Sequence, residues 1–187
     1  AEAFDYPESF FTPKVWKIRR PEADADEMAE AIAAIKAAEN PVIVAGGGVI
    51  YSGAEAALAA FASAHNIPVV ETQAGKSSLD FDHALNFGPV GVTGAASANT
   101  VCENADLVIG VGTRFQDFTT GSWALFKNPK RRILSINVAA YDAYKHGALN
   151  LTSDAKIALQ AIGKALGSQR WPSIPGLQAT WAANTAA

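Results

Sequence analysis

Short apolar runs alternate with helix-like stretches along the middle of the chain. The runs are "PVIVAG" (41–46), "IPVVE" (67–71), a short run near 85–87, "DLVIGVG" (106–112), "RRILSINV" (131–138) and "ALNL" (148–151). They do not alternate apolar and polar residues, which is typical of strands that are buried on both faces of a parallel sheet. The pattern therefore predicts the α/β class, with a doubly wound, Rossmann-like sheet of about six parallel strands and helices on both faces.

The stretches between these runs carry apolar residues at helical spacing. The first helix is expected to begin at a cap, Asp24 or Asp26, and to bury Met28, Ile32 and Ile35. Further helices are predicted at about 53–65, at 93–105, and after a cap at Thr152 or Ser153 with Leu159, Ile162 and Leu166 turned inward.

Both ends of the chain depart from this pattern. Residues 1–23 combine prolines with aromatic residues, which predicts an extended interdomain segment whose rings pack along a surface. Residues 167–187 predict a linker and the start of a truncated helix, with Trp171 and Trp181 exposed. The central α/β domain is then 24–166. The chain has no initiator methionine and stops inside that last helix, so we expect a piece of a longer protein.

Composition narrows the possible partners. The chain has 187 residues, is 49% hydrophobic and carries a formal net charge of -3, which suits one domain with a substantial core. No basic cluster exceeds the short turn at 130–132, so a nucleic-acid partner is not expected. No apolar run is long enough to span a membrane. The single cysteine, Cys102, excludes an internal disulfide, favours a cytoplasmic location, and is predicted to be a buried small hydrophobe rather than a nucleophile.

The run of three glycines after the first predicted strand raises the question of a nucleotide site. A dinucleotide fingerprint needs G-x-G-x-x-G. Counting from Gly46, the second glycine is Gly48, but the third position holds Tyr51. Glu71 stands where an acid for the ribose is expected, which is a weak match. The alternative interpretation, slightly favoured, is that the glycines only let the strand turn sharply into its helix.

A second glycine turn, "GVGTRF", follows the strand at 106–112. Ligands of doubly wound sheets lie where the strand order reverses, so the two turns are expected to line one nucleotide or phosphate crevice. Its candidate binding residues are Gly47, Gly48, Gly112, Thr113 and Arg114. Arg114 suits a phosphate or carboxylate, or else an ion pair with Asp117 or a neighbouring domain. Lys76 is a weaker candidate, more typical of a solvated loop.

No constellation predicts catalysis or metal binding by these residues. The sequence has no H-E-x-x-H, G-x-S-x-G or G-x-x-x-x-G-K-[ST] motif. His65 and His146 have no ligand spacing. Asp80, Asp82 and His83 are close in sequence, but a polar loop is the favoured interpretation. We therefore predict no catalytic residue and no metal ligand.

Three longer stretches occur in a specific order: "PVIVAGGGVIYSGAEAALAAFASAHNIPVVETQAGKSSL", "GPVGVTGAASAN" and "ADLVIGVGTRFQDFTTGS". This series resembles the central domain of thiamine-diphosphate-dependent enzymes, the family of acetohydroxyacid synthases and pyruvate oxidases. The resemblance covers roughly 24–166. At finer grain, "EAFDYPESFF", "VWKIRRP" and "ETQAGKSSLDFDHALNFGPVGVTG" are similar to members that hydrolyse a C–C bond of a cyclic dione in myo-inositol breakdown.

The resemblance implies three α/β domains, of which this chain supplies the middle one. In the family, the first domain provides a glutamate that activates the thiamine, and the third provides a G-D-G…N motif that holds Mg²⁺ and the diphosphate. This chain has no G-D-G. The resemblance thus implies that thiamine diphosphate and Mg²⁺ bind to the flanking catalytic domains, that the full-length enzyme is a homo-oligomer, and that this fragment alone is inactive.

Flavin-binding members of the family carry acids after the fifth strand that contact the adenosine part. The matching stretch here is "SINVAA", with Asn137 and Ala139 in place of those acids. This difference disfavours flavin, while Arg114 leaves an ADP-like or phosphate ligand open.

Two other functions remain open from the sequence. One is a self-contained module that binds ADP, FAD or NAD through the two glycine turns. The other is a structural dimerisation domain whose aromatic ends, Phe10, Phe11, Trp16, Trp171 and Trp181, anchor an interface.

Overall fold

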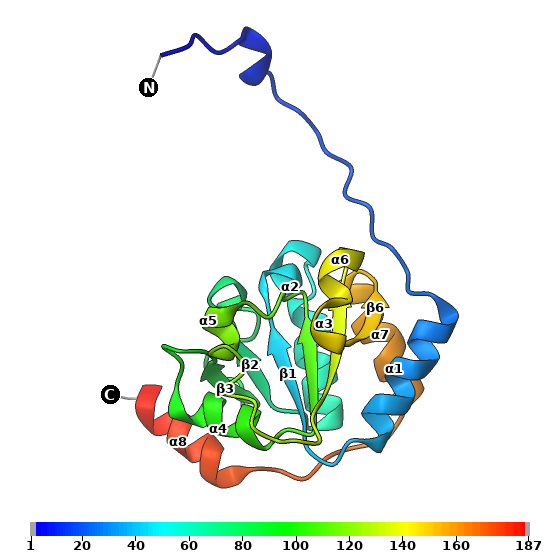
Figure 1. Cartoon of the computed structure of the whole chain (residues 1–187), viewed down its shortest axis with the longest axis vertical. Helices are drawn as coiled ribbons and strands as arrows, with labels where there is room; N and C mark the ends of the chain where they lie inside the picture. The colour runs from blue at the N-terminus through cyan, green and yellow to red at the C-terminus, as the bar shows by residue number, and fades with distance from the viewer. Residues whose placement is uncertain (1–2, 186–187) are drawn as a thin grey trace.

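The computed structural model describes residues 3–185 and contains one six-stranded sheet (Figure 1). The strands are β1 (Pro41–Ala45), β2 (Val69–Glu71), β3 (Asn86–Pro89), β4 (Leu107–Val111), β5 (Arg132–Asn137) and β6 (Leu149–Thr152). They are ordered β3-β2-β1-β4-β5-β6, and every neighbouring pair is parallel. The predicted doubly wound α/β sheet is confirmed.

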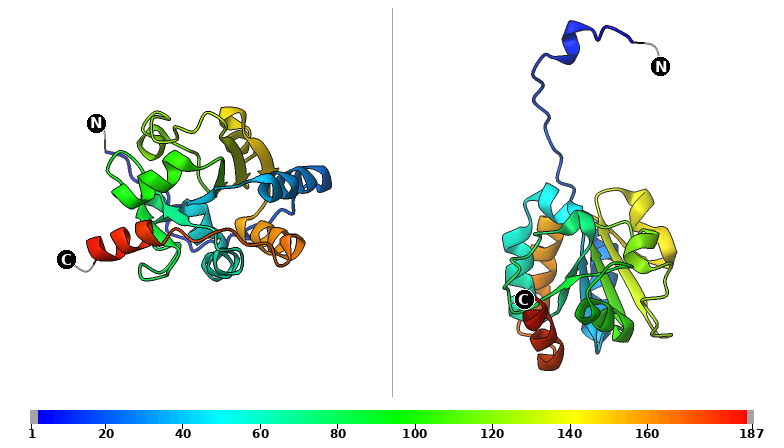
Figure 2. Two further views of the ribbon diagram at one scale, coloured as in Figure 1. Left: turned by 90° about the horizontal axis from the view of Figure 1, so that it is seen from below. Right: turned by 90° about the vertical axis from the view of Figure 1, so that its left-hand side faces the viewer.

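Helices cover both faces of the sheet (Figure 2). They are α1 (Ala25–Ala37), α2 (Gly47–Ser52), α3 (Glu55–His65), α4 (Ala96–Asn104), α5 (Asp117–Thr120), α6 (Ala140–Ala143), α7 (Ala155–Leu166) and α8 (Pro175–Thr185), with 3-10 turns at Glu8–Phe10, Gln73–Gly75 and Lys145–Gly147. Alternate residues of β1 face opposite cores. Ile43 and Ala45 pack with α1, α3 and α7, whereas Val42 and Val44 pack with α4. Burial on both faces explains the unbroken apolar runs.

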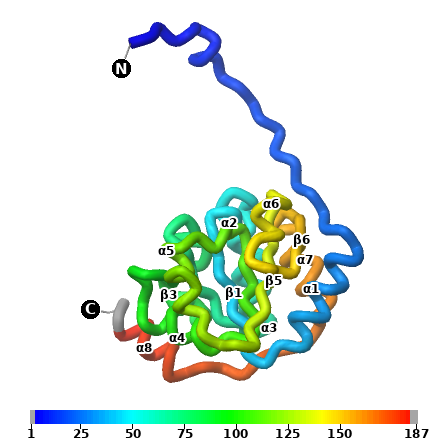
Figure 3. The backbone as a smooth tube through the Cα atoms, in the orientation of Figure 1, coloured from blue at the N-terminus to red at the C-terminus, as the bar shows by residue number. Residues whose placement is uncertain are grey.

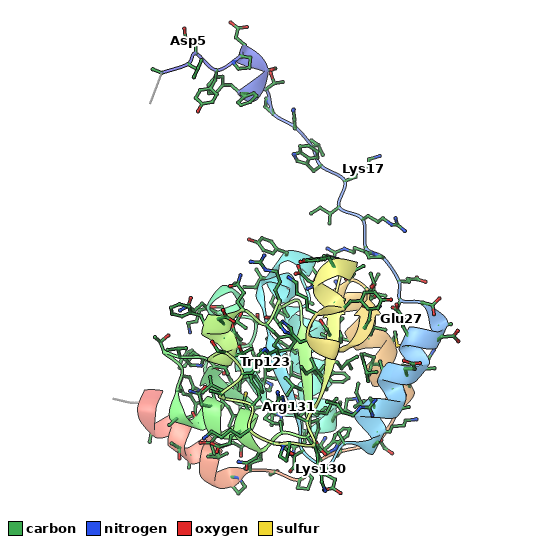
Figure 4. The ribbon with its side chains drawn as sticks, in the orientation of Figure 1. Asp5, Lys17, Glu27, Trp123, Lys130 and Arg131 are labelled. Atoms are coloured by element: carbon green, nitrogen blue, oxygen red, sulfur yellow. The ribbon has the colours of Figure 1, made fainter. Side chains whose placement is uncertain are left out.

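A loop rather than a long helix covers part of the second face between β4 and β5. Phe115 and Phe126 fill this part of the core. Trp123 stacks on Arg131, with 5.5 Å from the guanidinium carbon to the ring centroid, and Figure 4 shows the two side chains close together in front of the sheet. His146 packs against the same ring, at 4.7 Å between centroids. These aromatic contacts hold the loop where a crossover helix would otherwise lie.

The helix caps agree with the sequence prediction at α1 and differ at α7. Asp24 caps α1, because its Oδ1 accepts hydrogen bonds from the first-turn amides. At α7 the cap is Asp154, not Thr152 or Ser153. Thr152 is still part of β6, and the Ser153 hydroxyl donates to the carbonyl of Pro21 at 3.0 Å. Asp154 also forms an ion pair with Arg20 at 2.9 Å.

Replacing Asp154 by alanine should lower the free energy of unfolding more than the same change at Asp24. Each substitution removes an N-cap, worth about 1 kcal/mol. Asp154 is 3% exposed, and its loss also removes the ion pair with Arg20, which keeps its hydrogen bond to the carbonyl of Ser52 and access to water, so we expect about 1 kcal/mol more there. Urea unfolding followed by circular dichroism measures both variants. Equal losses would contradict a contribution from the Arg20 contact.

The N-terminal segment extends away from the sheet (Figure 1). Its aromatic side chains are exposed, namely Phe4, Tyr6, Phe10, Phe11 and Trp16. The expectation that these rings pack along a surface is therefore wrong for the surface of this domain. The outermost positions of the two predicted end segments, 1–2 and 186–187, lie outside the described residues.

The C-terminal segment passes beneath the sheet from α7 to the β3 edge (Figure 3). The prediction that Trp171 is exposed is wrong, because only 8% of it is accessible. Its indole N–H donates to the carbonyl of Ala38 at 2.8 Å, at the end of α1, and its amide donates to the carbonyl of His65 at 3.0 Å. Beyond it, α8 packs on α4 and β3, with Trp181 against Gly88.

Candidate functional site

The two glycine turns meet at the carboxyl ends of β1 and β4, the central neighbouring strands at which the strand order reverses. A crevice of about 610 Å³ opens there, a size typical of small-molecule sites. All five predicted residues line it: Gly47, Gly48, Gly112, Thr113 and Arg114. The structure thus brings together the residues that the sequence selected.

The glycines are required by the close approach of the two turns. A Cβ on Gly46 would lie 2.3 Å from the carbonyl oxygen of Gly112, and a Cβ on Gly48 would lie 2.6 Å from the Cα of Gly112. Gly112 itself has φ +61, where a side chain is strained. Only glycine at these positions lets the backbones touch.

The close contact between the two turns also engages backbone amides that a bound phosphate would need as hydrogen-bond donors. The amide of Gly46 donates to the carbonyl of Val111 at 2.9 Å, and that of Gly48 donates to the carbonyl of Gly112 at 3.0 Å. Two of the three successive glycine amides are therefore bonded to protein. This arrangement supports the packing interpretation of the glycine run.

Arg114 is the charged group best placed to meet a ligand. It is exposed and lines the crevice, and its guanidinium makes no hydrogen bond or ion pair with any residue in 3–185. The alternative of an ion pair with Asp117 is therefore not found in this range. Lys76 is exposed and does not line the crevice.

The candidate acids and amides around the crevice have other partners. Glu71 is buried, and its Oε1 accepts a hydrogen bond from the amide of Leu79 at 3.1 Å, so it does not present a carboxylate for a ribose. Asn137 donates to the carbonyl of Thr113 at 3.2 Å, which ties β5 to the second glycine turn. Asp142 lines the crevice and pairs with Lys145 at 2.7 Å.

Asp142 was not anticipated from the sequence. It lies in the four-residue helix α6, which has no periodicity to reveal which side chains turn toward the sheet. Only the return of the chain after β5 brings it to the crevice.

The histidines and the cysteine serve the fold. Buried His65 hydrogen-bonds through Nδ1 to the carbonyl of Gln169 at 2.8 Å. His83 accepts the amide of Leu85 at 3.1 Å. Burial raises the pKa of the Cys102 thiol, which keeps it neutral and disfavours a nucleophilic role.

No metal-binding cluster and no membrane span occur in the part of the chain that the structure describes. Within residues 3–185, no three His, Cys, Asp or Glu side chains gather in a way that suits a metal ion. None of the described helices has the length and apolarity needed to cross a bilayer.

Residues 28–162 match the family model described as the thiamine pyrophosphate enzyme, central domain. The chain belongs to this family. Several curated relatives are all described as 3D-(3,5/4)-trihydroxycyclohexane-1,2-dione hydrolase. The protein from Clostridium perfringens strain ATCC 13124 is 46% identical over 92% of this chain, that from Geobacillus thermodenitrificans 48% over 89%, and that from Bacillus subtilis 46% over 84%. The recognised family resemblance is confirmed.

This central domain spans only about a quarter of those relatives, 27%, 26% and 25% of their respective lengths. A solved structure gives a similar proportion. An X-ray structure of a candidate thiamin diphosphate-dependent enzyme from Mycobacterium smegmatis superposes with a TM-score of 0.67 at 25% identity, covering 83% of this chain and 30% of that one.

The groups that line the crevice do not fit thiamine diphosphate with Mg²⁺. The acid in the crevice, Asp142, is already paired with Lys145. The amides of Gly46 and Gly48 are bonded to the facing turn. Mg²⁺ beside a diphosphate is usually held by one or two protein carboxylates, and the residues that line this crevice provide no unpaired one.

Proposed function

We propose that the full-length protein is a thiamine-diphosphate-dependent hydrolase that cleaves a C–C bond of a trihydroxylated cyclic dione in myo-inositol degradation. The observation that carries this proposal is 46–48% identity, over 84–92% of the chain, to relatives described by that reaction. Thiamine diphosphate, when bound, supplies the electron sink that such a cleavage requires.

Within that enzyme, residues 24–166 serve as the central scaffold domain, and the segments on either side connect it to catalytic domains of the same chain. The paired Asp142, the bonded glycine amides and the absence of a G-D-G motif support placing thiamine diphosphate and Mg²⁺ on those other domains. We also propose a cytoplasmic homo-oligomer, a location supported by the use of a single, buried cysteine.

The test is an assay of the full-length protein with the cyclic dione, thiamine diphosphate and Mg²⁺. Ring opening that depends on the cofactor is the expected result, and its absence would reject the hydrolase assignment. The 187-residue chain under the same conditions should show no turnover. Turnover by that chain would reject the scaffold role.

The unpaired Arg114 favours a second candidate function, the binding of a phosphate-bearing nucleotide such as ADP, NAD or FAD in the crevice. Gly47, Gly48, Gly112 and Thr113 would form its backbone wall, and Arg114 would contact a phosphate. Two features reduce the expected affinity: the bonded amides of the glycine turn, and Asn137 in place of an acid.

Arg114→Gln should weaken binding of ADP at least about tenfold, because the substitution removes a charge-assisted contact. Lys76→Gln is the matched control, since Lys76 is exposed outside the crevice. Calorimetry of the 187-residue chain with ADP, NAD and FAD measures both variants. If none of the three gave heat at millimolar concentration, nucleotide binding would be rejected and only the scaffold role would remain.

A further inference from the structure

Several neutral polar side chains line the crevice between the glycine turns. Gln73 follows β2, Thr93 follows β3, and Gln116 and Thr119 follow β4. Within residues 3–185, the side chains of these four residues make no hydrogen bond with another residue. Side-chain amides and hydroxyls both donate and accept hydrogen bonds, as the hydroxyl groups of a sugar-like molecule do. The neutral groups of the crevice therefore suit a ligand that carries several hydroxyls.

The unpaired charge in the crevice is a single positive one. Arg114 makes no ion pair with any residue that the structure describes, whereas Asp142 is paired with Lys145 at 2.7 Å. A guanidinium binds one carboxylate through two parallel hydrogen bonds. One carboxylate would therefore balance the charge of the crevice. The diphosphate of a nucleotide carries more negative charge than Arg114 alone neutralises.

Two exposed aromatic rings lie beside these polar groups. Tyr51, in α2, is 85% exposed, Phe118, in α5, is 63% exposed, and both line the crevice. Their helices lie at the same end of the sheet (Figure 1). Small-molecule sites combine apolar surface of this kind with a few polar groups that orient the ligand. The C–H groups of a hydroxylated carbon chain would cover the rings and remove their apolar surface from water.

Backbone contacts hold the loops that carry these groups. In the loop after β2, Gly75 lies so close to β1 that a Cβ on it would be 2.1 Å from the carbonyl oxygen of Ala45. In the loop after β3, the amide of Val92 donates to the carbonyl of Phe118 at 2.9 Å. The walls of the crevice are thus fixed before a ligand arrives, which reduces the entropy lost on binding.

The groups that would favour a nucleotide are engaged elsewhere. The amides of Gly46 and Gly48 bond to the facing strand and turn, and the carboxylate of Glu71 accepts an amide of its own loop. The side chain of Asn137 is bonded to the second glycine turn. The unpaired groups are instead one cation, neutral hydrogen-bonding side chains and two apolar rings. This combination favours a hydroxylated carboxylate over a nucleotide.

The reaction under the proposed function yields a molecule of this class. When water cleaves the bond between the two carbonyl carbons of a cyclic 1,2-dione, its hydroxyl goes to one carbon, which becomes a carboxylic acid. Its hydrogen goes to the other carbon, which becomes an aldehyde. A trihydroxycyclohexane-1,2-dione, the compound in the relatives' description, thus opens to a six-carbon chain that keeps its three hydroxyls and gains one carboxyl group. That carboxyl group is ionised at neutral pH.

We infer that the crevice binds a hydroxylated carboxylate, the class to which the product of the proposed reaction belongs. Arg114 holds the carboxylate, the four neutral side chains hydrogen-bond to the hydroxyls, and the two rings pack on the carbon chain. The choice of the product as the natural ligand rests on the proposed function. Under that function this domain holds no thiamine diphosphate, so the product would bind here at a place separate from the reacting centre.

Calorimetric titration of the 187-residue chain with D-glucuronate tests the inference, because this probe carries one carboxylate and several hydroxyls on a short carbon chain. We expect a Kd of about 1 mM or tighter. D-Glucose lacks the carboxylate and hexanoate lacks the hydroxyls. Each of them should bind at least about tenfold more weakly than glucuronate, since each loses one of the two sets of contacts.

Substitutions locate the binding in the crevice. Arg114→Gln should weaken glucuronate binding at least about tenfold, and Gln116→Ala should weaken it about threefold, because they remove a charged and a neutral hydrogen-bonding partner. Lys76→Gln is the matched control, since this lysine is exposed outside the crevice, and it should leave the Kd unchanged. An equal loss with Lys76→Gln would show that glucuronate responds only to the overall charge, and would overturn the inference.

Three further results would also overturn the inference. One is the absence of heat with glucuronate at about 10 mM, ten times the expected Kd. Another is binding of hexanoate as tight as that of glucuronate, which would show that the hydroxyls make no contact. The third is binding of ADP that is tighter than that of glucuronate, which would assign the crevice to a nucleotide.

These titrations do not measure hydrolysis, so their failure can be distinguished from a failure of the proposed function. A full-length protein that opens the dione, together with a chain that does not bind glucuronate, would reject the crevice ligand and keep the hydrolase. A chain that binds glucuronate through Arg114, together with a full-length protein that leaves the dione intact, would reject the hydrolase and keep a site for hydroxylated carboxylates.

Discussion

Replacing Gly46 by alanine should lower the free energy of unfolding by about 3 kcal/mol, because the new Cβ has no room. It would lie 2.3 Å from the carbonyl oxygen of Gly112, which is backbone and cannot rotate away. The two glycine turns would have to separate, and the hydrogen bond from the Gly46 amide to Val111 would be strained. Urea unfolding followed by circular dichroism measures the loss.

Gly176→Ala is the control for this substitution. A Cβ at Gly176 meets nothing within 4 Å, and alanine is the better helix former, so the free energy of unfolding should change by less than about 1 kcal/mol. A Gly46 variant as stable as the Gly176 variant would show that the turns are not in close contact. The glycine run would then need another explanation, such as a ligand.

Replacing Trp171 by alanine should lower the free energy of unfolding by about 3–5 kcal/mol, as for other large buried aromatic residues. The change empties a site in the core that α1, α3 and α7 form with one face of the sheet, and it removes the hydrogen bond to the carbonyl of Ala38. Trp171→Phe keeps much of the buried apolar area, so it should lower the free energy of unfolding by less. About 1 kcal/mol of that decrease should come from the missing hydrogen bond.

Trp16→Ala is the matched control in the 187-residue chain. Its ring is 78% exposed, so the free energy of unfolding should stay within about 0.5 kcal/mol of the unchanged protein. If Trp171→Ala were equally harmless, the C-terminal segment would not be anchored beneath the sheet, and the covering of β3 by α8 would lose its support.

The sheet could be predicted from the sequence because its signal is local. Each strand is an apolar run of a few residues bounded by turn residues, and burial on both faces removes the alternation that would mark an exposed sheet. Six predicted runs correspond to β1–β6, with bounds that differ by one to a few residues. The helix cap at Asp154 was assigned one or two positions early, because Thr152, Ser153 and Asp154 are all good caps and only tertiary contacts distinguish them.

The burial of Trp171 could not be predicted because it depends on groups far away in the sequence. Its indole N–H and amide bond to carbonyls of Ala38 and His65, more than a hundred residues earlier. Because its neighbours in the sequence include proline and glycine, the local pattern predicts an exposed linker. Local sequence carries no sign of the free carbonyls at the ends of α1 and α3.

The sequence was enough to predict which residues line the candidate site, but not what the glycine turns contact there. The turns after two strands identify Gly47, Gly48, Gly112, Thr113 and Arg114 as neighbours, since adjacent parallel strands end at one edge. Whether the glycines approach a phosphate or a second backbone depends on the distance between the turns. The structure gives that distance and favours the backbone.

Titration of thiamine diphosphate with Mg²⁺, followed by calorimetry, tests the scaffold role most directly when the 187-residue chain is compared with the full-length protein. The account predicts heat of binding for the full-length protein and none for the 187-residue chain up to about 1 mM cofactor. Micromolar binding of thiamine diphosphate by the 187-residue chain itself would contradict it.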